Sequence, residues 1–374
     1  MMRKKIMLVI GTRPEAVKLA PVVKELEKYP DLFDVITVLT GQHREMLDQV
    51  MQVFHITPRH DLNIMQKNQT IVDVTQRAML GIYKLLEEDT PDMVIAQGDT
   101  TTVFVAGLMS FYKRIPFAHV EAGLRTYDNY SPYPEEINRR LTAPLAELHF
   151  APTQKSRDNL VGERIPADKV FITGNTVIDA LLYILENTSV NDKEYLASYG
   201  LEPKKFILVT AHRRESFGEP FRQLCIGLKR IADTYTDYKV IYPVHLNPNV
   251  RKPVFDILGD SPNITLIEPL DYFNFVHLMK HAHIILTDSG GIQEEAPSLG
   301  IPVLVLRDVT ERPEAVDAGT VRVVGTQSDS IFSEVKRLME DSSAYQSMAR
   351  AINPYGDGTS SRRIKDIIAQ YFKL

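Results

Sequence analysis

The chain has 374 residues, of which 43 are basic and 48 acidic, so its formal net charge is −5. This length predicts two domains of ordinary size. The single cysteine, Cys225, excludes an internal disulfide framework and any Cys-x-x-Cys metal or redox motif, and we interpret it as core filling. The slightly acidic charge balance argues against a nucleic-acid-binding protein.

No targeting or membrane segment is expected. The apolar run at 6–10 ends at Gly11-Thr12-Arg13-Pro14, which is too short for a secretion signal. A transmembrane helix needs about 18 consecutive apolar residues, and no such run occurs. These features predict a cytoplasmic protein with no membrane partner.

Short β-branched runs alternate with segments of helical period along the whole chain. The first half contains predicted strands at 5–10, 35–39, 93–97, 116–120 and 148–151, with helices at 15–28, 44–54, 71–88 and 101–112. A polar segment at 186–205 interrupts the alternation, and strands follow at 206–210, 240–243, 264–267, 284–287, 303–306 and 321–324. This pattern predicts α/β architecture with two parallel sheets, each covered by helices.

Several cofactor motifs are absent. The chain has no Gly-x-Gly-x-x-Gly, no Gly-Lys dipeptide and no His-Glu dipeptide, which excludes the usual dinucleotide fingerprint, a Walker A loop and a His-Glu-x-x-His zinc motif. His277 and His281 have a spacing that metal ligands use, but no carboxylate or cysteine joins them locally, so we interpret them as a helix face. We therefore expect neither a cofactor nor a metal.

Ligands of parallel α/β sheets bind beyond the carboxyl ends of the strands. The first strand is followed there by Gly11 and, near the start of a helix, by Arg13 and Lys18. Cations at a helix N-terminus favour anion binding, although an ordinary capped turn would explain the segment equally well.

Three carboxylates, Asp99, Glu121 and Glu135, follow successive strands of the same predicted sheet. Each has a structural alternative, as a helix N-cap or as a first-turn acid. Clustered carboxylates shift one another's pKa values apart, which provides an acid and a base near neutral pH. We therefore interpret the three together as a functional cluster.

The second half contains a candidate diphosphate site. Ser289, Gly290 and Gly291 separate a buried strand from a helix, so backbone N–H groups and a helix N-terminus can approach a phosphate. Glu295, one turn into that helix, is placed to accept hydrogen bonds from ribose hydroxyls. Further side chains that suit a diphosphate follow neighbouring strands, although each has a structural alternative: His212, Arg213 and Arg312.

Taken together, these segments resemble the non-hydrolysing UDP-N-acetylglucosamine 2-epimerases of bacteria. The resemblance spans nearly the whole chain and is carried by GTRPEA at 11–16, QGDTT at 97–101, EAGLR at 121–125, PYPEE at 132–136, TAHRRE at 210–215, TDSGGIQEE at 287–295 and ERPE at 311–314. It implies a GT-B-like fold, in which two Rossmann-type domains with parallel sheets face a central cleft. We expect an N-terminal domain at 1–175, with a C-terminal helix at 356–374 packing back on it, and a UDP-binding domain at 176–355.

The resemblance implies interconversion of UDP-GlcNAc and UDP-ManNAc without a cofactor. The C2 proton of the sugar is not acidic, so loss of UDP from C1, giving 2-acetamidoglucal, and its re-addition would allow inversion. By motif, the residues that look catalytic are Asp99, Glu121, Glu135 and His212, and those that look like UDP contacts are Arg13, Lys18, His212, Phe275, Ser289, Gly290, Gly291, Glu295 and Arg312. The family context implies a homodimer and a product used for surface polysaccharide or teichoic-acid linkage synthesis.

Some members of the family bind a second UDP-GlcNAc as an allosteric activator. Residues that match that site are Gln42, Arg213 and His245. The sequence departs from the pattern at Glu45 and Asn68, where glutamine and arginine are expected, and at Leu270 in the substrate site, where some relatives have glutamine.

Three alternatives remain open at this stage. A GT-B glycosyltransferase would use the same UDP site with a separate acceptor, but it needs fewer carboxylates. A hydrolysing relative would release free ManNAc, and a non-catalytic UDP-sugar sensor would keep only the nucleotide site.

Overall fold

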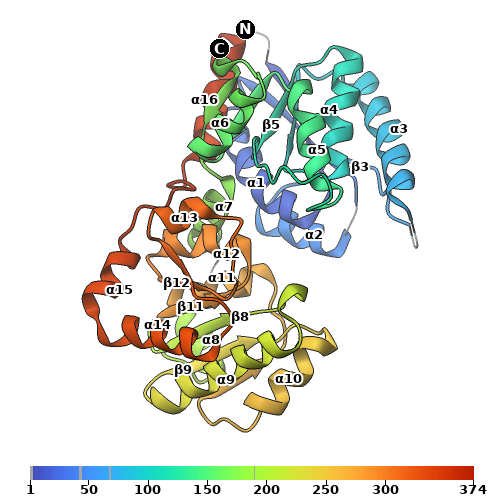
Figure 1. Ribbon diagram of the computed structural model, residues 1–374. Helices are drawn as coiled ribbons and strands as arrows, with labels where there is room; N and C mark the ends of the chain where they lie inside the picture. Colours follow the sequence, from blue (N-terminus) through green and yellow to red (C-terminus); the bar gives the residue numbers. More distant parts are fainter. Residues whose placement is uncertain (1–2, 42–43, 67–68, 189) are drawn as a thin grey trace. The chain divides into compact units, whose positions relative to one another are not determined.

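The computed structural model describes residues 3–41, 44–66, 69–188 and 190–374, apart from the side chains of 44–46. The chain forms two compact units (Figure 1). Unit 1 consists of Met1–Tyr183 and Tyr355–Leu374, and unit 2 of Ile184–Pro354. Each unit is an α/β domain built on its own parallel sheet, as the alternation of strands and helices predicts.

In unit 1, the described residues form a seven-stranded parallel sheet of order β3-β2-β1-β4-β5-β6-β7. Its elements are β1 (Lys4–Ile10), α1 (Arg13–Glu27), β2 (Phe33–Leu39), α2 (Arg44–Val53), β3 (His60–Asp61), α3 (Ile71–Asp89), β4 (Met93–Gln97), α4 (Thr101–Lys113), β5 (Phe117–Val120), α5 (Glu135–Thr142), η1 (Ala143–Leu145), β6 (Leu148–Ala151), α6 (Gln154–Gly162), η2 (Ala167–Lys169), β7 (Val170–Ile172), α7 (Thr176–Asn187) and α16 (Ser360–Phe372).

In unit 2, the sheet has six strands in the order β10-β9-β8-β11-β12-β13 over the residues described. Its elements are α8 (Asp192–Ser198), β8 (Phe206–Thr210), η3 (Arg214–Ser216), α9 (Glu219–Thr234), β9 (Lys239–Pro243), α10 (Pro248–Leu258), β10 (Ile264–Ile267), α11 (Tyr272–His281), β11 (Ile284–Thr287), α12 (Gly290–Glu295), η4 (Ala296–Leu299), β12 (Val303–Val305), α13 (Pro313–Asp317), β13 (Val321–Val323), α14 (Ser328–Glu340) and α15 (Ser342–Ala349).

The predicted strands are confirmed at their positions, with ends that differ by at most two residues. They form because their side chains are apolar on both faces: β4 and β5, for example, are buried along their whole length. Two further strands, β3 and β7, are not predicted from the sequence. These two strands lie at the sheet edges and have only two and three residues, so they carry too little hydrophobic pattern to be recognised.

The division into units differs from the predicted boundaries at 175/176 and 355/356. Unit 1 also includes residues 176–183 and Tyr355, so α7 begins in unit 1 and ends in unit 2. Asp179 explains this, because its buried carboxylate accepts hydrogen bonds from the backbone N–H groups of Ser360 and Ser361 at the start of α16. In the same unit, α16 packs against α1, and Lys4 Nζ lies 5.1 Å from the ring centroid of Phe372, which brings the chain ends together (Figure 1).

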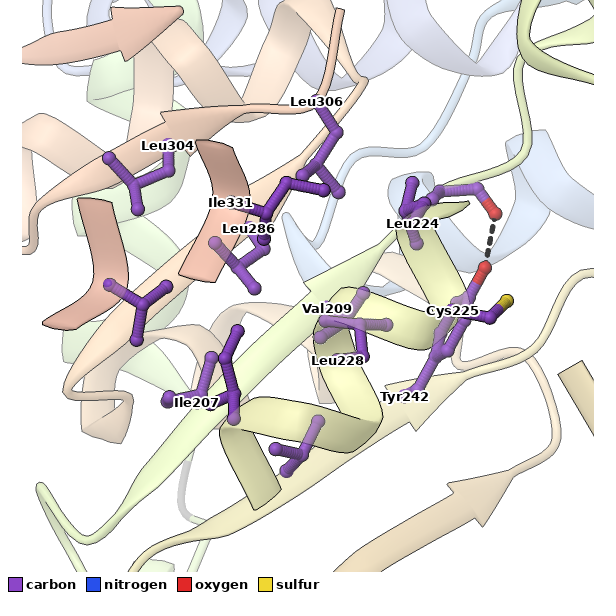
Figure 2. Close-up of a cluster of buried hydrophobic side chains, with 14 of the residues drawn as sticks. Ile207, Val209, Leu224, Cys225, Leu228, Tyr242, Leu286, Leu304, Leu306 and Ile331 are labelled. Carbon is purple, nitrogen blue, oxygen red and sulfur yellow. Dashed lines mark hydrogen bonds between the residues drawn. The ribbon is translucent and has the colours of Figure 1, made fainter. Parts of the chain in front are cut away.

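Unit 2 has a core in which β8, β9 and α9 meet (Figure 2). Cys225 lies there fully buried among Leu224, Leu228 and Tyr242, which confirms its interpretation as core filling. The buried Tyr242 hydroxyl donates to the carbonyl oxygen of Ala211 at 2.5 Å, the bond drawn in Figure 2. This bond fixes the backbone directly before His212.

Among the described residues, we find no helix that is both long and apolar enough to span a bilayer.

Candidate functional site

The strand order of unit 1 places a switch point between β1 and β4. Chain connections run outward in opposite directions from this pair, and α/β proteins bind ligands beyond the carboxyl ends of the strands at such a point. The segments that lie there are Gly11–Lys18 after β1 and Gly98–Thr100 after β4, with Glu121 following the adjacent β5. Two of the predicted carboxylates, Asp99 and Glu121, therefore lie at neighbouring strand ends.

Glu121 is buried and held by three donors from three segments. Lys18 Nζ lies 2.6 Å from Oε1, Asn175 Nδ2 donates to the same oxygen at 2.9 Å, and Gln97 Nε2 donates to Oε2. The residue has a positive φ of 63°, a conformation that is strained for a residue with a Cβ. This network orients the carboxylate and compensates its negative charge, as a buried ion requires.

The turn after β4 is supported from β5. His119 Nε2 lies 2.7 Å from the carbonyl oxygen of Gly98, so this nitrogen carries the proton. Burial lowers the pKa of His119 to about 4, which keeps the ring neutral at physiological pH. The histidine thereby connects the turn before Asp99 with the strand that leads to Glu121.

Asp99 is anchored to α5. Its Oδ2 lies 2.7 Å from Nη2 of Arg139 and also accepts a hydrogen bond from Nε at 2.9 Å, while its carbonyl oxygen accepts one from Asn138 Nδ2. The carboxylate remains partly exposed, so a ligand can reach it. Two nitrogens of the guanidinium thus contact the same carboxylate oxygen, which fixes the direction of the carboxylate.

The two glutamates at the start of α5 have different environments. Glu136 is fully buried and accepts hydrogen bonds from the N–H groups of Thr126 and Tyr127, both at 3.0 Å, so it holds the loop before α5. Glu135 is only half-buried and begins the helix. Of the pair, Glu135 is therefore the one accessible for chemistry.

The start of α1 contains a carboxyl group that sequence reasoning did not select. Glu15 is 2% exposed, and its Oε2 accepts hydrogen bonds from the N–H groups of Gly11 and Thr12. Burial raises its pKa to about 7. Arg13 and Lys18, predicted as phosphate contacts, are half-buried on the same helix, and Lys18 is paired with Glu121.

In unit 2, the turn after β11 leads through Ser289 into α12. A Cβ at Gly290 would lie 3.7 Å from the Arg312 guanidinium, which brings this arginine next to the turn. Arg312 Nε is paired with the buried Glu294. Glu295 Oε2 accepts a hydrogen bond from the Tyr272 hydroxyl at 2.7 Å. The predicted residues Ser289, Gly290, Glu295 and Arg312 thus lie together.

His212 follows β8 on the adjacent strand. Oδ2 of the buried Asp288 accepts hydrogen bonds from the N–H groups of His212 and Arg213, at 2.6 and 2.8 Å. The His212 ring stacks on His245 with centroids 5.2 Å apart. Burial lowers the pKa of His212, and the charges of His245 and Arg213 act in the same direction against that of Asp288. His212 is therefore largely neutral at pH 7 and able to accept a proton.

The remaining predicted residues differ in how far they are buried. Phe275 is half-buried on α11, Arg213 is half-buried and His245 is exposed. Gln42 and Asn68 lie outside the described residues, as does the side chain of Glu45.

His277 and His281 belong to a helix face that packs on α8. His277 Nδ1 and His281 Nε2 lie 3.1 and 2.9 Å from the carboxylate of Asp192, which also pairs with Lys280. In the part of the chain that the structure describes, no three His, Cys, Asp or Glu side chains are arranged to hold a metal ion. The histidines thus serve an ion-pair network.

The fold and the polar groups at the strand ends of both units define a GT-B-like α/β protein. A family model described as UDP-N-acetylglucosamine 2-epimerase matches residues 24–369. The chain belongs to this family.

Individual relatives agree over their full lengths. The UDP-N-acetylglucosamine 2-epimerase of Escherichia coli K12 is 56% identical, over 97% of this chain and 98% of that protein. The structure of the Neisseria meningitidis enzyme bound to UDP-GlcNAc is 49% identical with a TM-score of 0.88, covering 98% of this chain and 100% of that one. A Listeria monocytogenes structure, of a protein described as a putative UDP-N-acetylglucosamine 2-epimerase, is 44% identical with a TM-score of 0.94, over 100% and 97% of the two chains.

Proposed function

We propose that the protein interconverts UDP-GlcNAc and UDP-ManNAc by inverting C2 of the sugar. The observation that carries this proposal is the full-length identity with the E. coli epimerase and with the N. meningitidis enzyme bound to UDP-GlcNAc. The two oriented carboxylates Asp99 and Glu121 supply the proton-transfer groups that such a reaction needs.

The reaction proceeds by elimination and re-addition. A base removes the C2 proton, and the electron pair of the C2–H bond forms the C1–C2 double bond. The C1–O bond breaks, so that UDP leaves from the opposite face. The 2-acetamidoglucal then accepts a proton on the other face of C2 while the UDP oxygen re-forms the bond to C1. No electron is lost overall, so the step needs no redox partner.

We assign the proton transfers to a set formed by Asp99, Glu121, Glu135 and His212. Asp99 and Glu121 are each paired with a cation, Arg139 and Lys18, which orients their oxygens for proton transfer. His212 is largely neutral and can protonate or stabilise the departing diphosphate only after it has accepted a proton. The set provides for proton removal and return without a bound metal.

We assign UDP binding to the residues that the family resemblance predicts, described for each unit separately. In unit 2, the backbone of Ser289, Gly290 and Gly291 and the Arg312 guanidinium suit the diphosphate. Glu295 suits the ribose hydroxyls and Phe275 the uracil ring. In unit 1, Arg13 and Lys18 suit the phosphate nearest the sugar.

We propose a homodimer formed through α3 and α4 of unit 1. These two helices pack side by side, and they expose large apolar side chains: Val72 is 72% exposed, Leu80 67% and Phe111 61%. Val72, Leu80 and Met79 line a groove of about 480 Å³ on α3. Apolar surface gathered in this way is typical of a subunit interface.

We further propose activation by a second UDP-GlcNAc at Arg213 and His245. The stacking of His245 on His212 supports it, because a ligand that moved His245 would act on the catalytic set. We place the reaction in the cytoplasm and its product in surface polysaccharide or teichoic-acid linkage synthesis.

Incubation with UDP-GlcNAc alone, followed by proton NMR of the anomeric signals, tests the function. Appearance of UDP-ManNAc up to a constant ratio is the expected result. Release of free ManNAc would instead identify a hydrolase, and an unchanged spectrum would leave the protein a transferase or a sensor.

A further inference from the structure

The side chain of Glu15 lies at the switch point of unit 1 and has no place in the chemistry above. It is buried between the ends of β1 and β4, and its Oε2 lies 2.6 Å from the N of Gly11 and 3.2 Å from the N of Thr12. A Cβ at residue 11 would lie 3.0 Å from Oε2, so the glycine permits this close approach. The carboxyl group thus determines the shape of the turn between β1 and α1.

The other oxygen of Glu15, Oε1, belongs to the buried side-chain polar atoms of the described residues that lack a hydrogen-bond partner. Oε1 is buried without a hydrogen-bond partner, and so is Oγ1 of Thr100 beside it. Buried polar atoms are seldom left unpaired. A proton on Oε1 would turn these two atoms into a donor and an acceptor.

Burial and the charge of Asp99 also favour the neutral form of Glu15. Burial raises its pKa to about 7, and the negative charge of Asp99 acts in the same direction, while the nearby Thr100 side chain and the hydrogen bonds from Gly11 and Thr12 oppose both. The charged group that acts on Glu15 directly is Asp99. The other ionisable groups of the neighbouring segments are Arg13 and Lys18 on α1, Glu121 after β5 and Arg139 on α5. Asp99 and Glu121 are each engaged with one of these cations.

We propose that Glu15 is a positioning residue for the UDP-sugar: its Oε2 fixes the Gly11–Thr12 turn that leads to Arg13 and Lys18, and its ionised form disfavours the diphosphate. This inference rests on the proposed function, since it needs a diphosphate at the start of α1. Ionised Glu15 would place another negative charge next to Asp99, close to where that diphosphate binds. The diphosphate of UDP-GlcNAc is a diester and keeps a constant charge from pH 6 to 8.5.

The test compares wild type with Glu15→Gln, which keeps an acceptor oxygen for Gly11 and Thr12 but stays neutral at every pH. We measure kcat, KM and the calorimetric Kd for UDP-GlcNAc between pH 6 and 8.5. For wild type, KM and Kd are expected to rise about fivefold with a midpoint near pH 7, with a smaller change in kcat. For Glu15→Gln, both are expected to change by less than about twofold.

Glu25→Gln is the matched control. Glu25 is another buried carboxylate of α1, paired with Lys28 away from the strand ends, and this variant should keep the wild-type pH dependence. An equal rise of KM and Kd in wild type and Glu15→Gln would overturn the inference. If Glu15→Gln does not fold, the NMR chemical shifts of the Gly11 and Thr12 amides are followed in wild type as the pH is varied. A change with a midpoint near pH 7 supports the inference, and no change overturns it.

Failure of the proposed function has a different signature. A wild-type protein that binds UDP-GlcNAc but does not convert it would refute the epimerase, while the Kd comparison would still decide the role of Glu15. A wild-type protein that does not bind UDP-GlcNAc at all would refute both.

Discussion

Lys18 Nζ and Glu121 Oε1 lie 2.6 Å apart, so a cation in the first turns of α1, where we propose that phosphate binds, is paired with a carboxylate of the proposed catalytic set. The side chains come from α1 and from the end of β5, and they are 19% and 6% exposed. In the proposed function, this ion pair connects substrate binding with proton transfer, because a diphosphate that attracts Lys18 also changes the charge around Glu121.

Lys18→Met tests this connection. Glu121 would keep its amide donors Gln97 and Asn175 but lose the positive charge of Lys18 beside Oε1. We expect kcat/KM to fall about 100-fold or more, with both kcat and KM affected, because loss of one charged group in a catalytic site has this magnitude. Lys24→Met, which removes a cation of the same helix that pairs with Glu27, should leave both parameters unchanged.

Gly123→Ala tests how the fold holds Glu121. Gly123 has a φ of 92°, and a Cβ there would lie 2.1 Å from the carbonyl oxygen of Ser156. We expect the free energy of unfolding to drop by about 3 kcal/mol or more, measured by urea denaturation. Gly162→Ala, where a Cβ would meet nothing within 4 Å, should be neutral, and equal losses in the two variants would contradict this account.

Because of two buried histidines, we expect the free energy of unfolding to decrease in acid. Burial lowers the pKa of His119 to about 4 and that of His149 to about 3, against about 6.5 in the unfolded chain. Because the unfolded chain binds these protons first, their stabilisation is complete above pH 6.5 and is lost as the pH falls towards 4. Each contributes a slope of about 1.4 kcal/mol per pH unit in that window.

His149→Phe isolates the contribution of His149. The titration of the carboxylates affects the stability of wild type and of the variant equally, so it cancels in the comparison. The variant should lose stability less steeply than wild type between pH 6.5 and 4 in urea denaturation. Parallel curves would show that His149 is not kept neutral by the fold.

The apolar surface of α3 and α4 leads to a prediction about assembly. Leu80→Glu should convert the proposed dimer to a monomer in light scattering, because it places a charge in an apolar contact. Ile352→Glu is the control, since Ile352 is 87% exposed in unit 2, and it should leave the mass unchanged. A wild-type protein with the mass of one chain would exclude the dimer.

The sequence predicts most of the sheets and the strand-end positions of the site, because buried parallel strands are continuous apolar runs and chemistry follows their ends. It does not reveal Glu15, whose position three residues after Thr12 is that of an ordinary capping glutamate. Only the fold shows that this side chain is buried beside Thr100, in the segment that follows β4. Arg139 and Asn175 were missed for a related reason: they are 40 and 54 residues away from Asp99 and Glu121, the carboxylates that they contact.

The asymmetry of Glu135 and Glu136 illustrates the same limit. Adjacent acids at a helix start look equivalent in the sequence, yet Glu136 is buried on the amides of Thr126 and Tyr127 and Glu135 is half-exposed. The direction in which the helix packs decides which of them a substrate can reach. No local pattern encodes that direction.

Incorporation of solvent deuterium at C2 of the sugar is the most direct test of the central claim, that Asp99 and Glu121 transfer the C2 proton. Wild type incubated with UDP-GlcNAc in D2O should produce UDP-ManNAc that carries deuterium at C2. Asp99→Asn and Glu121→Gln should each abolish incorporation while UDP binding, measured by calorimetry, stays within about threefold of wild type. Normal incorporation in both variants would contradict the account.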